Sequence, residues 1–263
     1  MTLRANAGKL GGNGNRAPIR LRPNVPVAIQ IANLLRVQLR TDYAEGGRLP
    51  GENAMAAEMG VSRGTVRQAL AILQHEGLIS RHQGSGTYAN PNVLGIPARI
   101  DFAYEFSELI TASGYQSTIK TLEVRQEAAS SATASALDIK PGAPVLYLRK
   151  LFLANGEPAI YVHELLSTAL ILEPYEPAEL EQPMWHFIER RCHRQLKYGL
   201  SEVIPSLAVG DVAELLALAA GSPVLKFDEV FFGIHNEPLT QAIIYFHEPL
   251  IRFHALRKVS MIN

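Results

Sequence analysis

The first third of the chain alternates apolar-periodic segments with glycine-centred turns. Apolar residues recur at helical spacing behind Pro26. Gly60 can adopt the left-handed backbone of a tight turn, and Ser62 is a suitable N-cap for the segment that follows. This pattern predicts helices at about 26–40, 52–59 and 63–76, and strands at about 78–81 and 87–89.

The rest of the chain contains an internal repeat. Segment 141–158 matches segment 220–238, with Gly, Pro, Val, Leu and Phe residues recurring 79 positions later. Each copy follows an alanine- and leucine-rich helix, at 128–138 and 211–220, and is itself typical of a β-hairpin. Two such units predict a pseudo-symmetric antiparallel sheet with helices on it, and thus an α+β fold.

The balance of basic and acidic side chains changes at about residue 90, between the helical first third and the repeat-containing remainder. The first 90 residues hold 11 basic and 5 acidic side chains, whereas the remainder holds 14 and 20. A basic module joined to an acidic one suggests a polyanion-binding domain that carries a second function. The alternative is a chance excess of charge on a solvated surface.

The composition of the chain, and its changes along the sequence, indicate how the chain is organised. It is 47% apolar and 19% charged, which excludes a disordered chain. There is no membrane-length apolar run and no secretory leader, so we expect a cytoplasmic protein without membrane attachment. The expected parts are a flexible basic tail at 1–24, a winged helix-turn-helix domain at 25–90, a linker at 91–98, and an effector-binding and dimerisation domain at 99–258.

The segment after the first helix fits a DNA-reading helix-turn-helix. Ala56, Gly60 and Val66 stand where a close helix approach, a turn and a core residue are needed. The next helix and the following hairpin then offer polar groups to a DNA groove and backbone: Ser62, Arg63, Thr65, Arg67, Gln83, Gly84, Ser85 and Gly86. The alternative is a structural module that touches no nucleic acid.

Residues 49–89 closely resemble the winged helix-turn-helix of GntR-family bacterial transcription regulators. The matching runs are Leu49 to Glu52, Gly60 to Leu70, Glu76 to Ile79 and Gly84 to Thr87. The resemblance implies that the residues named above bind DNA, and it adds Glu52. Many members carry an arginine after this glutamate, where this chain has Asn53, so the resemblance does not imply the DNA contact of that arginine here.

The second half resembles the UTRA ligand-sensing domain of the HutC-type branch, whose fold is like that of chorismate lyase. The repeat, residues 104–115 and residues 155–158 carry this match. The resemblance implies an N-terminal winged helix-turn-helix followed by an antiparallel-sheet effector domain. A lyase-like enzyme is a weak alternative, because a shared fold does not imply shared chemistry and no catalytic motif is present.

The resemblance also implies an effector site. In sugar-phosphate sensors a helix start holds the phosphate, and Phe106, Ser107 and Glu108 occupy that run; the alternative is a helix start that caps itself. Positions that hold cationic and polar ligands in those sensors are Lys150, Phe152, Thr240 and Phe246 here, and we add His163. We therefore expect a smaller or more apolar effector with one anionic group, a carboxylate, phosphonate or sugar phosphate, paired to Lys150. Other pocket residues, or an unused pocket, are the alternatives.

Metal and thiol chemistry are not expected. His163-Glu164 and His247-Glu248 resemble metal ligands, but adjacent strand residues point to opposite faces of a sheet. Cys192 is the single cysteine and reads as an ordinary helix residue. We expect no catalytic residues, no metal and no cofactor.

The sequence therefore predicts a DNA-binding transcription regulator, a repressor that acts as a homodimer on double-stranded, imperfectly palindromic operator DNA. A small-molecule effector would reposition the DNA-binding heads through the 90–98 linker. The alternative from another class is a protein-interaction scaffold with a silent winged helix.

Overall fold

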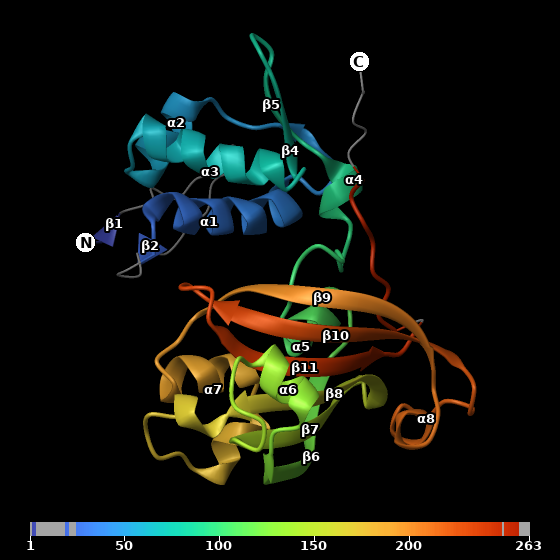
Figure 1. Cartoon of the computed structure of the whole chain (residues 1–263). Helices are drawn as coiled ribbons and strands as arrows, with labels where there is room; N and C mark the ends of the chain where they lie inside the picture. The colour runs from blue at the N-terminus through green and yellow to red at the C-terminus, as the bar shows by residue number, and fades with distance from the viewer. Residues whose placement is uncertain (1, 4–18, 21–24, 249, 258–263) are drawn as a thin grey trace, which may run out of the picture. The chain divides into compact units, whose positions relative to one another are not determined.

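The computed structural model describes residues 2–3, 19–20, 25–248 and 250–257 (Figure 1). Its contacts divide the chain into two compact units, residues 1–96 with 256–263, and residues 97–255. We call the first unit the head and the second the effector unit. Both combine helices with antiparallel sheet, which confirms the α+β class. Within the described residues, no helix has the length and apolar character needed to span a membrane.

The head contains the predicted helices and hairpin, with ends within two residues of those expected. A three-stranded antiparallel sheet has the order β3-β5-β4. The elements are α1 (Val27–Asp42), β3 (Gly47–Arg48), α2 (Glu52–Met59), α3 (Arg63–His75), β4 (Ile79–His82), β5 (Gly86–Ala89) and α4 (Pro91–Leu94).

One face of each long head helix is buried in a common core. Leu35 on α1 and Leu70 on α3 are almost completely buried, as the helical spacing of apolar residues requires. Arg36 on α1 donates two hydrogen bonds, of 3.0 and 2.7 Å, to the carboxylate of Glu76 just after α3. Apolar packing and this bidentate pair fix α1 against α3.

Strand β3, helix α4 and the position of Leu256 in the head were not expected. The predicted linker 91–98 begins with α4, because Pro91 starts a helical turn and Val93 and Leu94 are buried in the head core. Leu256, which was assigned to the second domain, packs against the same core. It lies over Gly77, where an added Cβ would come within 2.4 Å of Leu256 Cδ2.

The predicted tail 1–24 lies largely outside the described residues. Within it, β1 (Thr2–Leu3) pairs antiparallel with β2 (Ile19–Arg20). Regular structure was not predicted at these four residues, because their segment lacks apolar periodicity. The predicted domain end at residue 258 also lies outside the described residues.

The effector unit is built on one six-stranded antiparallel sheet of order β6-β7-β8-β11-β10-β9 (Figure 1). Helices and 3-10 turns lie between its strands. The elements are α5 (Phe106–Ala112), β6 (Ser117–Ala128), α6 (Ser131–Ala136), β7 (Pro144–Ala154), β8 (Glu157–Ser167), η1 (Thr168–Leu170), η2 (Pro177–Glu181), α7 (Met184–Arg191), β9 (Leu196–Leu207), α8 (Asp211–Leu215), β10 (Pro223–Gly233) and β11 (Pro238–Phe246).

The sequence repeat corresponds to the two predicted hairpins, β7–β8 and β10–β11. Each hairpin is extended by a strand that was not predicted, β6 beside β7 and β9 beside β10. The helices before the hairpins are shorter than expected. Asp138 and Ala217 have φ of +51° and +53°, and a left-handed backbone of this kind ends a right-handed helix.

One face of the sheet, here called the inner face, is covered by α5. Phe106 of α5 packs edge-on against Phe152 of β7, with ring centroids 5.1 Å apart, and against Phe246 of β11 at 6.3 Å. At the end of the unit, His254 forms a parallel bridge with Arg99. Two hydrogen bonds of 2.9 Å make this bridge, His254 N to Ala98 O and Ile100 N to His254 O.

We expect Leu70→Ala to lower the free energy of unfolding of the head by about 2–5 kcal/mol, because it empties a fully buried site. Val37→Ala is the control, since Val37 lies on the exposed face of α1. Thermal or urea unfolding of both variants checks the difference. Equal losses would show that α3 does not form the head core as described.

Candidate functional site

A groove of about 790 Å³ lies on the head, between the start of α2, the start of α3 and the β4–β5 hairpin. Its charged lining includes three arginines, Arg48, Arg63 and Arg81, and one carboxylate, Glu52. Gly84 and Gly86 line it from the hairpin. Of the predicted DNA-binding residues, the groove brings together Glu52, Arg63, Gln83, Gly84 and Gly86, whereas Ser62, Thr65, Arg67 and Ser85 do not line it.

Glu52 organises the arginines of this groove. Its carboxylate accepts hydrogen bonds from Arg63 Nε at 2.9 Å and from Arg81 Nη2 at 2.5 Å. Burial raises the pKa of Glu52, but the hydrogen bond and charges of the arginines outweigh burial and hold this pKa below its usual value. A carboxylate repels phosphate, so Glu52 acts on the arginines rather than as a phosphate ligand.

The predicted residues at the start of α3 divide into capping groups and exposed arginines. Ser62 Oγ accepts the Thr65 backbone N–H at 3.0 Å and lies 2.9 Å from Thr65 Oγ1, so this pair caps α3. Arg63 remains 63% exposed beside Glu52. Arg67 is exposed, and no hydrogen bond or ion pair of its side chain occurs within the described part of the chain.

The wing is exposed and depends on two glycines. Gly84 and Gly86 have φ of +77° and +118°, which other residues rarely adopt. A Cβ at Gly86 would lie 2.7 Å from Arg48 Nε, so the glycine lets this arginine cross the strand. Gln83 and Ser85 are exposed at the hairpin tip. Arg48 was not predicted, although a basic residue directly before the Leu49–Glu52 motif was a usable signal.

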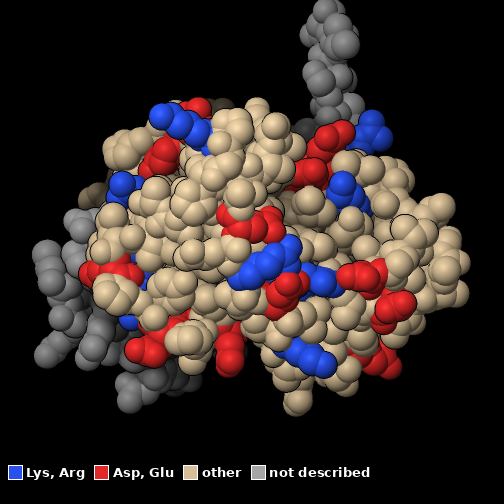
Figure 2. Space-filling view, turned by 60° about the horizontal axis from the view of Figure 1, so that its bottom comes forward, with Lys and Arg blue, Asp and Glu red and all other residues tan. Residues whose placement is uncertain are grey.

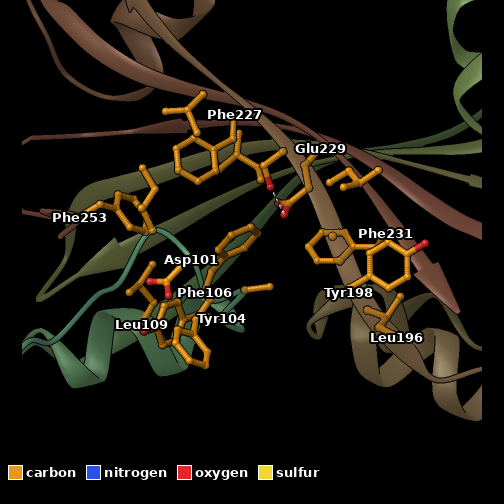
Figure 3. A pocket seen from close by; sticks show the side chains of 18 of the residues that line it. Asp101, Tyr104, Phe106, Leu109, Leu196, Tyr198, Phe227, Glu229, Phe231 and Phe253 are labelled. Atoms are coloured by element: carbon orange, nitrogen blue, oxygen red, sulfur yellow. Dashed lines mark hydrogen bonds between the residues drawn. The ribbon is translucent and has the colours of Figure 1, made fainter. Parts of the chain in front are cut away.

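The effector unit holds a cavity of about 780 Å³ on the inner face of the sheet (Figure 3). It is lined by the 100–104 segment, α5, β9, β10 and the end of β11. Phe106 and Phe246, both predicted, line it. Phe152 packs behind Phe106 and does not reach the cavity wall.

Two predicted polar ligands are engaged within the protein. Lys150 is fully buried, forms an ion pair of 3.2 Å with Glu164 and donates to the Gln182 carbonyl at 2.7 Å. Thr240 donates its hydroxyl to the Leu165 carbonyl at 2.9 Å. Neither residue lines the cavity. The partner of Lys150 in this structure is thus Glu164, and its pairing with an effector anion stays a prediction.

The helix start predicted to hold an anion already holds a carboxylate. Glu105 is the N-cap of α5, and its two oxygens accept the backbone N–H groups of Ser107 at 2.9 Å and Glu108 at 3.1 Å. These amides are therefore satisfied by the chain itself. The structure thus has the alternative form of this motif, a helix start that is capped by the chain's own side chain.

His163 lies on the sheet face opposite the cavity. Its Nδ1 is 2.7 Å from the Tyr147 hydroxyl, and burial lowers the pKa of the imidazole. The effector role predicted for His163 is therefore corrected, because alternation along β8 turns it away from the inner face. Glu164, next in the chain, faces Lys150 instead. No cluster of three metal-ligating side chains occurs among the described residues.

Several cavity residues were not predicted. On β10, Phe227, Glu229 and Phe231 alternate and face the cavity, and Tyr198 and Ser201 approach from β9. The usable signal was a single acid between two phenylalanines at period-two spacing, which marks a carboxylate on a buried sheet face. Cys192, in contrast, lies outside the cavity, and burial raises the pKa of its thiol to about 11.

Comparison with known proteins identifies both units. Residues 28–89 match the model of the gntR family of bacterial regulatory proteins, and residues 112–250 match the UTRA domain. The HTH-type transcriptional regulator Rv0792c of Mycobacterium tuberculosis is 28% identical, over 87% of this chain and 84% of that protein. The histidine utilization repressor of Pseudomonas putida is 27% identical, over 68% and 70%. The crystal structure of YydK from Bacillus subtilis, a possible transcriptional regulator, has a TM-score of 0.72 at 18% identity, over 89% of this chain and 100% of that chain.

The chain belongs to the GntR family. It is a DNA-binding transcription regulator with a UTRA effector domain. Proteins of the GntR family regulate transcription and do not catalyse reactions, so the lyase-like alternative is dropped.

Figure 2 shows one face of this GntR-family protein, and both basic and acidic side chains occur on it. On that face, basic and acidic side chains lie near one another within a larger uncharged area, and neither sign forms a continuous patch. A strong field of one sign, which attracts a polyanion over a distance, is therefore not a feature of this face.

We expect Ser62→Ala to lower the free energy of unfolding by about 0.5–2 kcal/mol, because it removes the N-cap of α3. Ser80→Ala on exposed strand β4 is the matched control. Urea unfolding followed by circular dichroism measures both. A Ser62→Ala variant as stable as Ser80→Ala would contradict the capping role.

Proposed function

We propose that the head binds operator DNA with the start of α3 in the major groove. The observation that carries this proposal is the exposure of Arg63 and Arg67, one helical turn apart on α3, with Arg63 in the lining of an arginine-rich groove. Arginine can form paired hydrogen bonds to guanine or to phosphate. Glu52 positions Arg63 and Arg81 for this contact by holding both guanidinium groups.

The β4–β5 hairpin acts as the wing. Its tip, Gln83 to Gly86, has little side-chain bulk and follows Arg81 and His82. Backbone N–H groups at such a tip can approach phosphates closely. Ser62 and Thr65 contribute through the cap of α3, and their hydroxyls stay exposed or half-exposed beside the helix start.

The effector unit senses a small molecule in its aromatic cavity. The volume of about 780 Å³ lies within the range of ligand pockets, which is about 300–1,000 Å³. Binding regulates operator affinity only if the effector prefers one arrangement of the heads over another. We propose that the protein is a repressor in the cytoplasm, where its operator DNA is found.

Homodimerisation is supported by the edge strand β9. It forms one end of the sheet, and Leu200 and Leu207 on it are 63% and 58% exposed. Exposed apolar edge strands favour pairing with another chain. A two-fold dimer would present two heads to a palindromic operator.

We expect Arg67→Ala and Arg63→Ala each to weaken binding to DNA from upstream of the protein's own gene by about 1–3 kcal/mol. Arg40→Ala is the control, because Arg40 is exposed on α1, away from the groove. Fluorescence anisotropy over a salt series measures affinity, and loss of a phosphate contact reduces the salt slope by about 1.

Binding by the double variant Arg63→Ala/Arg67→Ala that equals wild type would overturn this function. It would favour the scaffold alternative, in which the winged helix contacts protein rather than DNA. Loss of operator binding in Arg40→Ala to the same degree would show only a general charge effect.

A further inference from the structure

The carboxyl group of Glu229 is the one strongly buried acid in the wall of the effector cavity. Its residue is only 6% exposed, and Figure 3 shows it pointing into the cavity between Phe227 and Phe231. It accepts a hydrogen bond of 2.5 Å from Ser201 Oγ. No ion pair to Glu229 occurs among the residues that the structure describes.

The fold reserves space for this group. Glu229 lies on β10 beside β9, where an added Cβ at Gly199 would come within 2.5 Å of Glu229 Oε1 and 3.0 Å of Phe231 Cε1. A glycine at this point of a long strand costs strand stability, since it lacks a side chain to pack. The missing side chain leaves room for a carboxyl group that has no cationic partner in the described part of the chain.

The surroundings of Glu229 suit a positive charge. Nine of the residues lining the cavity are aromatic, although aromatic residues are only 7% of the chain. Aromatic faces attract cations, and more strongly where water is excluded. The other charged residues of the lining are Asp101, paired with Arg99, and the exposed Lys197. Burial raises the pKa of Glu229, which is the effect of removing a carboxylate from water without a compensating charge.

An anionic effector lacks a matching site here. Lys150 is neutralised by Glu164, and the amides at the start of α5 are occupied by Glu105. A second negative charge close to Glu229 would be repelled in a cavity of low dielectric. Among the described residues of the lining Lys197 is the one cation, and it is exposed, so the buried charged group of the cavity wall is the Glu229 carboxyl group, which opposes an anion.

We propose that the effector of this regulator is an organic cation, an amine with an apolar or aromatic body, whose charged group binds Glu229. The proposal rests on the proposed function, since it names the ligand class of the same effector cavity. Glu229 supplies the counter-charge and the aromatic walls enclose the body. Ser201 orients the carboxyl group through its hydroxyl.

Three probes with one common body test this: 4-phenylbutylamine, 4-phenylbutanol and 4-phenylbutanoate. Each is titrated into the full-length protein at neutral pH and followed by calorimetry and by the fluorescence of Trp185, the single tryptophan, which lines the cavity. We expect the amine to bind at least about tenfold more tightly than the alcohol or the carboxylate, a factor that corresponds to about 1.4 kcal/mol.

The variant Glu229→Gln keeps the shape of the side chain and removes its charge. We expect it to lose the preference for the amine, while Glu202→Gln, an exposed acid on β9, keeps it. Melting curves check that both variants fold. Operator affinity without ligand should equal that of wild type in Glu202→Gln, and it is also measured for Glu229→Gln, so that a loss of DNA binding is distinguished from a loss of cation binding.

Four results would overturn the proposal. One is tighter binding of the carboxylate than of the amine. Another is tightest binding of the alcohol, which would make Glu229 a protonated hydrogen-bond donor. The third is an unchanged amine preference in Glu229→Gln, and the fourth is no binding of any probe at millimolar concentration.

Discussion

The pairing of β8 with β11 at the centre of the sheet is the contact on which the effector unit depends. It joins the two copies of the repeat through seven residue pairs, from Thr240 with Leu166 to Phe246 with Ile160. Because side chains alternate, this register places Phe246 on the cavity face and stacks Tyr161 and Tyr245 on the other. A shift of one residue would exchange the two faces and remove the cavity.

Local signals in the sequence predict the head well, because the end of α2 and the start of α3 are each encoded by one residue. Gly60 has a left-handed backbone, and Ser62 is the N-cap of α3. Strands β6 and β9 were missed because both are edge strands of mixed polarity, and their pairing with β7 and β10 defines them. The partner of Lys150 was missed for a related reason, since Glu164 reaches it only through the β7–β8 register.

Carboxylates explain much of how the chain departs from its expected ligand chemistry. Glu52 binds two arginines, Glu105 caps α5 and Glu164 neutralises Lys150. In each case the sequence motif predicts that a cation or a backbone amide binds a ligand, whereas in the structure a carboxylate of the protein binds that group. A motif reports which groups are present, whereas the available charge depends on which of them remain unpaired after folding.

The return of Leu256 to the head core has a topological consequence. The chain leaves the head after residue 96 and rejoins it at residue 256, and a parallel bridge ties Arg99 to His254 between these two crossings. The head core is therefore built from two segments of the chain that are separated in sequence by the whole effector unit. Leu256, although far in sequence from the winged helix, belongs to the core of the DNA-binding unit, so a substitution at this position would act on the head first.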